Sequence, residues 1–253
     1  VTIVDLDVFK GRHQVQPFLS NEQIPGLASL GKVVRQKKAL VGVNGGFYNY
    51  EGKPLGAVMI EGQMVSEPLY NRAALGITKT GEVLIDNLKW RGLLTTSNNN
   101  NIVIDAVNRK PNNENEIILY NRYYGAKTPQ FKQQSVEFVI ENNMIKNVES
   151  GSMIQNEIPA NGFIVKIFTK ENNLDAFKQG KKIEYKNIFN PAWHKEDVVN
   201  IMGGGPKLIT DGEVTVTGEL EEFSQDITAG RAPRTAVGIT EQNHLLFVTV
   251  DGR

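Results

Sequence analysis

The sequence has 253 residues, of which 40% are hydrophobic and 22% charged, and its 28 basic side chains balance 28 acidic ones. This balance gives no overall field to attract nucleic acid or an anionic membrane, so an anion site must be built locally. The absence of cysteine excludes disulfides, thiol nucleophiles and thiolate zinc sites. No apolar run reaches the ~20 residues of a membrane-spanning helix. We predict a single domain over residues 1–253.

Strand patterns dominate the chain. Val1–Phe9 alternates apolar and polar residues, and Leu245–Val250 is an apolar run typical of a buried central strand. Helical patterns are limited to Ser29–Lys38, which leads into Ala39–Val43, and to Leu174–Gln179, which is closed by a glycine. We predict an α+β fold with a β-rich, mixed or antiparallel sheet and few helices, and with Ser29–Lys38 packed on the sheet. The other predicted strands are Ala57–Ile60, Glu82–Ile85, Ile117–Tyr120, Val136–Ile140, Phe163–Phe168 and Val214–Thr217.

Two parts of the chain resemble each other. The pattern R-x-A-[LV]-G-I-T occurs at Arg72 and again at Arg234, 162 residues later. It predicts two pseudo-repeated halves that share one sheet system, with chance recurrence of a short strand motif as the alternative. The first copy comprises Asn44-Gly45-Gly46, Val58–Gly62 and Ala74–Thr78, and the second comprises Gly203-Gly204-Gly205, Lys207–Gly212 and Ala236–Thr240.

Two glycine-rich corners follow apolar segments. In Asn44-Gly45-Gly46, glycine tolerates positive φ and close backbone approach at little cost, and successive N–H groups could form an anion-binding nest. A plain tight turn is the alternative. Gly203-Gly204-Gly205 is neither a Walker loop nor a G-x-G-x-x-G fingerprint. Because three consecutive glycines are costly in chain entropy, we infer that this corner needs a bare backbone.

Charged residues near the C-terminal end complete the candidate site. Arg231 and Arg234 bracket a rigid Ala-Pro, and arginine suits bidentate phosphate recognition, although surface ion pairs are the alternative. Asp251 and Arg253 follow the last predicted strand and are well placed to face a cleft, unless they only form a turn. A carboxylate from Glu219, Glu221 or Glu222, in the irregular segment before Arg231, could also enter the cleft.

Together these motifs resemble the phosphodiester glycosidase family, the domain of bacterial proteins and of the animal enzyme that uncovers mannose 6-phosphate. Family members continue beyond the final motif with a helix and a second Asp-Gly-Gly-Gly-Ser-like motif of the same site. The resemblance therefore implies that this chain lacks a C-terminal tail. The matching pieces, in family order, are NGGFY (Asn44–Tyr48), PLGAVMIEGQMV (Pro54–Val65), NRAALGI (Asn71–Ile77), MGGGPKLITDG (Met202–Gly212), RAPRTAVGIT (Arg231–Thr240) and VDGR (Val250–Arg253).

The resemblance implies hydrolysis of the bond between a sugar C1 and a phosphodiester oxygen, as in N-acetylglucosamine 1-phosphodiesters. Because phosphate is already a good leaving group, the reaction needs cationic stabilisation of phosphate and a carboxylate that assists water or attacks C1. Asp251 is the first candidate for that carboxylate and Glu222 the second. The candidate substrate contacts are Asn44, Gly45, Gly46, Arg72, Gly203, Gly204, Gly205, Arg231, Arg234, Thr235 and Arg253.

No cofactor follows from the sequence, and a divalent cation held by acidic residues stays open because no spacing marks its ligands. The expected partner is a sugar phosphate or a phosphorylated glycan, with no nucleic acid and no membrane span. We expect an extracytoplasmic protein, periplasmic or secreted. Two other classes stay open: a non-catalytic glycan-phosphate binding module, and a protein that sequesters a small-molecule or nucleotide phosphate.

Overall fold

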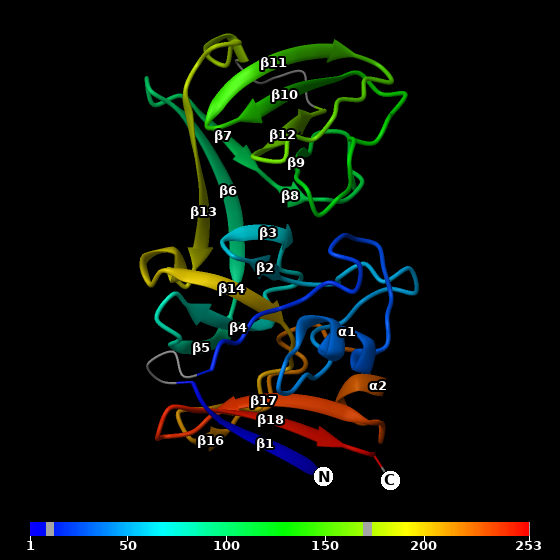
Figure 1. Ribbon diagram of the computed structural model, residues 1–253, viewed down its shortest axis with the longest axis vertical. Helices are drawn as coiled ribbons and strands as arrows, with labels where there is room; N and C mark the ends of the chain where they lie inside the picture. Colours follow the sequence, from blue (N-terminus) through cyan, green and yellow to red (C-terminus); the bar gives the residue numbers. More distant parts are fainter. Residues whose placement is uncertain (9–12, 169–173, 253) are drawn as a thin grey trace.

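The computed structural model describes residues 1–8, 13–168 and 174–252, and these residues form mainly β-sheet (Figure 1). Between the described strands every ladder is antiparallel, except where β8 (Ala106–Val107) pairs with β9 (Ile117–Tyr120). The predicted β-rich sheet with few helices is therefore confirmed. The helices of this part of the chain are α1 (Leu30–Lys37), α2 (Gln225–Thr228) and the 3₁₀ helices η2 (Leu174–Ala176) and η3 (Trp193–Lys195), none of which could cross a membrane.

A five-stranded sheet forms the centre of the molecule. Its middle strands are buried on both faces, which explains why the AALGIT stretch carries no charged residue. Ala74 packs into the main core on one face, whereas Leu75 and Ile77 pack into a second cluster on the other. The strand order is β3 (Gln63–Ser66), β2 (Val58–Ile60), β14 (Val198–Gly203), β4 (Ala73–Thr78) and β5 (Val83–Asn87).

A three-stranded sheet lies below the central sheet in Figure 1, in the order β1 (Thr2–Asp7), β18 (His244–Val250), β17 (Arg234–Ile239). Leu245 of β18 is fully buried, in one cluster with Leu75 and Ile77 of the central sheet. The two terminal segments of the chain are therefore joined by the β1–β18 ladder and packed on β4. Of the predicted strand Val214–Thr217 only Val214 is in a strand, as the short β15 (Ile209–Thr210) pairs with β16 (Glu213–Val214).

A second five-stranded sheet lies at the other end of the molecule, and a long ribbon connects it to the centre (Figure 1). One core cluster includes Leu94 of the ribbon, Phe138 of this distal sheet and Ile201 of the central sheet, all completely buried. The distal and central sheets are therefore held together by one core. The distal order is β11 (Met144–Gly151), β10 (Ser135–Glu141), β12 (Gly162–Ile167), β9, β8, and the ribbon order is β13 (Ile183–Asn190), β6 (Lys89–Thr96), β7 (Asn101–Ile104).

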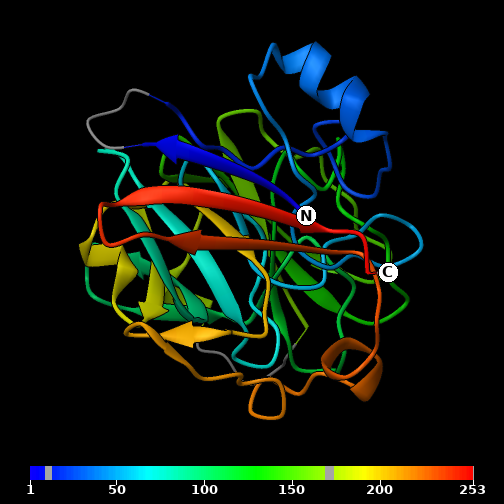
Figure 2. The same ribbon diagram turned by 90° about the horizontal axis from the view of Figure 1, so that it is seen from below.

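Helix α1 lies within the predicted Ser29–Lys38 but does not have the predicted packing. None of its residues is buried, and Figure 2 shows it at the periphery of the molecule rather than on a sheet. Its apolar side chains contact the segment that follows it, because a Cβ added at Gly42 would lie 2.6 Å from Cγ2 of Val34. Residues Ala39–Val43, whose pattern is apolar, form no strand. The predicted helix Leu174–Gln179 is reduced to the single turn of η2.

The hairpin turns β4–β5 and β17–β18 have the same hydrogen bonds, 162 residues apart. In each turn a threonine hydroxyl accepts from the N–H four residues on, and Gly81 and Asn243 take positive φ at equivalent positions. The surroundings differ, because β4 is an interior strand and β17 an edge strand. The matching bonds are Thr78 N to Glu82 O (2.9 Å), Gly81 N to Thr78 O (3.1 Å) and Glu82 N to Thr78 Oγ1 (3.0 Å), against Thr240 N to His244 O (3.0 Å), Asn243 N to Thr240 O (2.9 Å) and His244 N to Thr240 Oγ1 (3.1 Å).

Candidate functional site

Three strands of the central sheet meet at one edge. Both β2 and β4 run antiparallel to β14, so the residues that begin them lie beside the residues that end β14. The N–H of Gly203 donates to the carbonyl of Ala57 (2.6 Å), and the N–H of Gly204 donates to the carbonyl of Ala73 (2.8 Å). Arg72, which directly precedes β4, is therefore held next to the second glycine corner.

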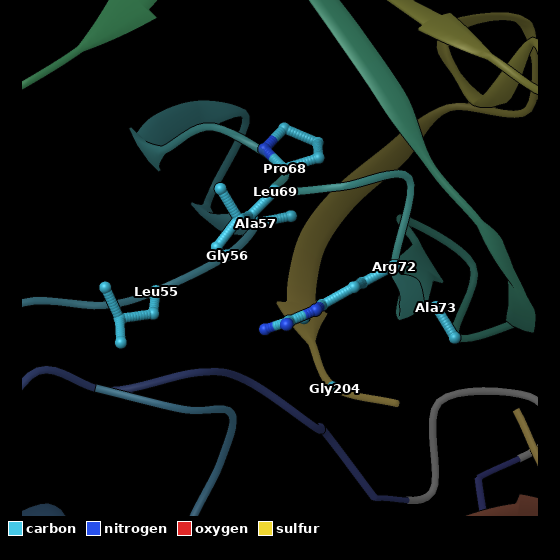
Figure 3. Close-up of a pocket in the computed structure, with 9 residues that line it drawn as sticks. Leu55, Gly56, Ala57, Pro68, Leu69, Arg72, Ala73 and Gly204 are labelled. Carbon is cyan, nitrogen blue, oxygen red and sulfur yellow. The ribbon is translucent and has the colours of Figure 1, made fainter. Parts of the chain in front are cut away.

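A small pocket opens at this edge (Figure 3). Its volume is about 10 Å³, which is room for about one water molecule. The pocket can therefore receive one oxygen of an anion, whereas the rest of a larger ligand must lie across its rim. The lining residues are Leu55, Gly56, Ala57, Pro68, Leu69, Arg72, Ala73, Gly203 and Gly204.

The guanidinium of Arg72 is fixed by its surroundings and points into the space between Gly56 and Gly204 (Figure 3). Its Nε donates to the carbonyl of Glu221 and its Nη2 to the carbonyl of Glu222, both at 3.1 Å. The ring of Phe223 lies 3.9 Å from the guanidinium carbon, a cation–π contact. Arginine has five N–H donors, and Nη1 has no hydrogen-bond partner among the described residues. A cation with free donors is therefore presented to the pocket.

The two glycine corners pack directly on each other. A Cβ added at Gly46 would lie 2.2 Å from the carbonyl oxygen of Gly203, and one at Gly45 would lie 2.7 Å from Sδ of Met202. Glycine is thus needed at Gly45 and Gly46 because the two backbones approach closely, and not because of positive φ. In the two corners only Gly205 has positive φ (106°). The N–H of Gly46 faces the Met202 sulfur at 3.3 Å, so it is not free for an anion. The nest predicted there is not formed by this group.

The segment before Arg231 contributes one buried carboxylate, that of Glu221. The residue is 1% exposed, and its carboxylate accepts from the N–H of Ala73 and the N–H of Lys207 (both 2.8 Å) and from the hydroxyl of Thr217. It thereby ties the start of β4, directly after Arg72, to the segment that follows the second glycine corner. The side chain of Glu222 is instead exposed. Nothing in the charge run distinguished these two residues in the sequence.

The guanidinium of Arg234 is hydrogen-bonded to backbone carbonyls and does not point into an open pocket. Its guanidinium donates to the carbonyls of Asp226 (3.2 Å), Ile227 (3.4 Å), Gly230 (3.3 Å) and Pro233 (3.2 Å). The contacts to Asp226 and Ile227 cap the C-terminal end of α2, a common role for a cationic side chain, and the other two hold the loop that follows. Arg234 therefore holds the loop that carries Arg231.

Thr235 connects this loop to the first glycine corner. Its hydroxyl donates to Oδ1 of Asn44 at 3.5 Å, a long hydrogen bond. Because the Gly45–Gly46 part of that corner packs on Met202 and Gly203, the start of β17 is linked through it to the Arg72 pocket.

Asp251 and Arg231 lie together at the end of the three-stranded sheet. A Cβ added at Gly252 would lie 2.3 Å from the carbonyl carbon of Ala232, which places Asp251 beside the Arg231 loop. Both side chains are exposed, and neither has a hydrogen-bond or ion-pair partner within the described ranges. Arg253 lies outside the described residues. None of the described members of this group lines the Arg72 pocket.

Seven of the predicted site residues thus fall into two groups. One is the pocket of Arg72, Gly203 and Gly204, and the other is the exposed group of Asn44, Arg231, Thr235 and Asp251. No cluster of three or more histidine, aspartate or glutamate side chains suited to a metal ion occurs in the part of the chain that the structure describes. A divalent cation therefore has no ready ligand set there.

The sequence model of the phosphodiester glycosidase family matches residues 134–253. The resemblance to the phosphodiester glycosidases is confirmed. The match covers just under half of the chain and includes the second glycine corner, the Arg231 loop and Asp251. Arg72 and the first glycine corner lie outside the matched residues. No curated protein matches this phosphodiester glycosidase-like chain.

Two solved structures have a similar fold. A hypothetical protein from Synechocystis matches over 98% of this chain, with a TM-score of 0.81 and 22% identity. A "Putative exported protein" from Burkholderia pseudomallei matches over 100% of this chain, with a TM-score of 0.67 and 18% identity. The phosphodiester glycosidase-like chain spans 47% and 59% of these two chains, about half of their length. At these identities the likeness concerns the fold alone.

Proposed function

We propose that this protein hydrolyses sugar-1-phosphodiesters, with N-acetylglucosamine 1-phosphodiesters as the first candidates. Water adds to C1 of the sugar, the bond from C1 to the phosphate oxygen breaks, and that oxygen keeps the electron pair. The products are the free sugar and a phosphomonoester. The observation that carries the proposal is Arg72, whose unpaired N–H groups face a pocket beside Gly203 and Gly204.

In this proposal Arg72 binds the phosphate and stabilises the charge that develops on it as the sugar departs. The pocket has room for about one oxygen, so one phosphate oxygen enters it and the sugar lies across the rim. Leu55 of the rim is 42% exposed, and the ring of Tyr70, which lies 5.3 Å from the Arg72 guanidinium carbon, is also exposed. These apolar surfaces suit the carbon face of a sugar ring.

The second group of residues acts on the other side of the substrate. Asp251, an exposed carboxylate, is proposed to assist water or attack C1, with Glu222 as the second candidate. Arg231 has a free guanidinium and would add a second phosphate contact, while Arg234 positions its loop. Further proposed substrate contacts are Asn44, Gly45, Gly46, Gly203, Gly204, Gly205, Thr235 and Arg253.

A non-catalytic role is the second candidate, as a binding module for glycan phosphates or a sequestering protein for small phosphates. It is favoured by the division of the site, because Asp251 does not line the pocket that contains Arg72. In this role Arg72 would bind the phosphate and no bond would break.

We also propose an extracytoplasmic location. The proposal is supported by the name of the Burkholderia protein with a similar fold.

We further propose that the two segments with the R-x-A-[LV]-G-I-T pattern belong to related halves. Support comes from the equivalent turns after Thr78 and Thr240, which form the same three backbone and hydroxyl hydrogen bonds. In such a repeat Arg72 and Arg234 would be counterparts. Both guanidinium groups do donate to backbone carbonyls of residues 221–233.

The catalytic proposal is tested by turnover of methyl N-acetylglucosamine 1-phosphate, a simple sugar-1-phosphodiester. We expect release of free sugar, and a loss of about 100-fold in kcat/KM for Arg72→Lys, which keeps the charge but removes the guanidinium donors. The 4-nitrophenyl glycoside of the same sugar presents no phosphate, so any cleavage of it should change much less. Tight binding without turnover would support the binding module instead.

A further inference from the structure

A second cavity lies where the β2–β3 hairpin meets the distal sheet and the ribbon; Figure 1 shows the hairpin near the middle of the molecule and the distal sheet above it. Its volume is about 210 Å³, against about 10 Å³ for the Arg72 pocket. It shares no lining residue with the Arg72 pocket. Gly62 and Met64 come from the hairpin, Ile140 and Phe163 from the distal sheet, and Tyr185 from the ribbon.

The floor of this cavity is held by a hydrogen-bonded network. The hydroxyl of Tyr185 donates to Oδ1 of Asn187 (2.7 Å), which also accepts from Nε1 of Trp90 (2.9 Å). Nδ2 of the Asn187 amide donates to the carbonyl of Gly62 (3.1 Å). Burial raises the pKa of Tyr185, so its hydroxyl stays protonated and keeps this donor role. The cavity is therefore preorganised rather than formed on binding.

The rim of the cavity carries amides whose hydrogen-bonding groups are free. The side chains of Asn143 and Asn161 are exposed and have no hydrogen-bond partner within the described part of the chain. The side-chain oxygen Oε1 of Gln63 accepts from Nε of Arg122 (3.0 Å), which leaves the side-chain NH2 of Gln63 free to donate. An amide offers a donor and an acceptor side by side, as neighbouring hydroxyl groups require.

The wall of the cavity includes two aromatic rings, and its lining carries no charged residue. The rings of Phe163 and Tyr185 lie 5.2 Å apart and are tilted by 53°. None of the described lining residues is charged, so the cavity offers nothing to hold an anion. An apolar wall with a few fixed polar groups is typical of small-molecule sites.

From these features we propose that the cavity is a binding site for a neutral saccharide, one sugar ring in size. The carbon face of the ring packs on Phe163, and its hydroxyl groups pair with the amides of Gln63, Asn143 and Asn161. This site is separate from the Arg72 pocket, and the proposal does not depend on catalysis there.

Saturation-transfer NMR with glucose, N-acetylglucosamine and maltotriose tests the proposal. We expect transfer to at least one of them, with Kd on the order of 1 mM. Asn143→Gly removes one amide at a residue with φ 58°, so glycine keeps the turn, and it should weaken binding at least about fivefold. Phe163→Leu keeps an apolar side chain without the ring and should weaken binding at least as much.

The matched control is Asn142→Gly, in the same turn at φ 50° but outside the cavity, and it should leave Kd unchanged. Arg72→Lys should also leave Kd unchanged. The proposal is overturned if no neutral saccharide shows transfer, or if both asparagine variants weaken binding equally. It is also overturned if binding is lost in Arg72→Lys, because the sugar would then lie at the first pocket. Thermal unfolding of each variant verifies that its fold is intact.

Discussion

The side-chain carboxylate of Glu221 accepts a 2.8 Å hydrogen bond from the backbone N–H of Ala73, the residue that follows Arg72. In turn, Arg72 donates to the backbone carbonyl of Glu221 (3.1 Å). The two segments, nearly 150 residues apart, are thus tied in both directions. This reciprocal pair fixes the guanidinium at the edge of the central sheet.

Glu221→Gln should destabilise the protein by about 2–3 kcal/mol, because an amide NH2 would face an N–H donor in a buried site. The free energy of unfolding in urea measures this change. Glu222→Gln is the matched control, since its side chain is exposed, and should change stability by less than about 0.5 kcal/mol. Equal effects of the two substitutions would show that the Glu221 carboxylate does not anchor this edge.

Arg234→Lys should reduce stability by about 1 kcal/mol, because lysine cannot keep all four carbonyl contacts, two to α2 and two to the loop that follows it. Because Arg234 acts through its loop, kcat/KM should fall by a similar factor for a sugar-1-phosphodiester and for an aryl glycoside. Steady-state kinetics on both substrates verify this. A loss confined to the phosphodiester would instead make Arg234 a direct phosphate ligand.

The two equivalent turns should tolerate an exchange of their central residues. We expect less than about 1 kcal/mol of destabilisation in either direction, because Gly81 and Asn243 both accept positive φ. Gly81→Val is the control and should cost more, because a β-branched residue is strained at φ 88°. If both variants with exchanged turn residues fail to fold, the result would argue against related halves. The grafts are Lys79→Glu, Thr80→Gln and Gly81→Asn in one turn, and Glu241→Lys, Gln242→Thr and Asn243→Gly in the other.

The ion pair of Glu116 with Arg109 predicts a pH dependence of stability. The pKa of Glu116 is lowered, chiefly by hydrogen bonds from Arg109 at 2.8 and 2.9 Å. A carboxyl whose folded pKa is depressed stabilises the fold above its unfolded pKa and loses this contribution as pH falls through the folded pKa. Glu116→Gln should therefore cost about 2 kcal/mol at pH 7 and much less near pH 3.

Urea unfolding of the Glu116→Gln variant at both pH values measures this difference. Glu157→Gln, in an exposed pair with Lys127 at 3.7 Å, is the control and should change little at either pH. A cost that stays constant between pH 7 and pH 3 would contradict the account.

Much of the fold could be predicted from local pattern. Ile117–Tyr120 has its predicted bounds as β9, and Ser29–Lys38 encloses α1, because each depends on its own periodicity. The long ribbon strands β6 and β13 were missed. Burial does alternate along β6, but Gly92 and Thr96 occupy buried positions and Leu93 a half-buried one, so the apolar residues of the sequence do not show the alternation.

The candidate site was predicted in its parts but not in its connections. Arg72 and the glycine corners were among the predicted substrate contacts, and the structure brings Arg72 to Gly203 and Gly204. The hydrogen bonds of Arg234 to α2 and the burial of Glu221 could not be predicted, because each depends on a tertiary contact of an irregular segment. The role of each residue in catalysis stays a prediction.

The central claim concerns which bond is broken, and hydrolysis in ¹⁸O-enriched water tests it most directly. The protein is incubated with methyl N-acetylglucosamine 1-phosphate, and the mass of the methyl phosphate product is measured by mass spectrometry. This product is chosen because the anomeric oxygen of free sugar exchanges with water. If water attacks C1 while Arg72 holds the phosphate, methyl phosphate carries no ¹⁸O. Methyl phosphate that contains ¹⁸O would show cleavage at phosphorus and would contradict a glycosidase.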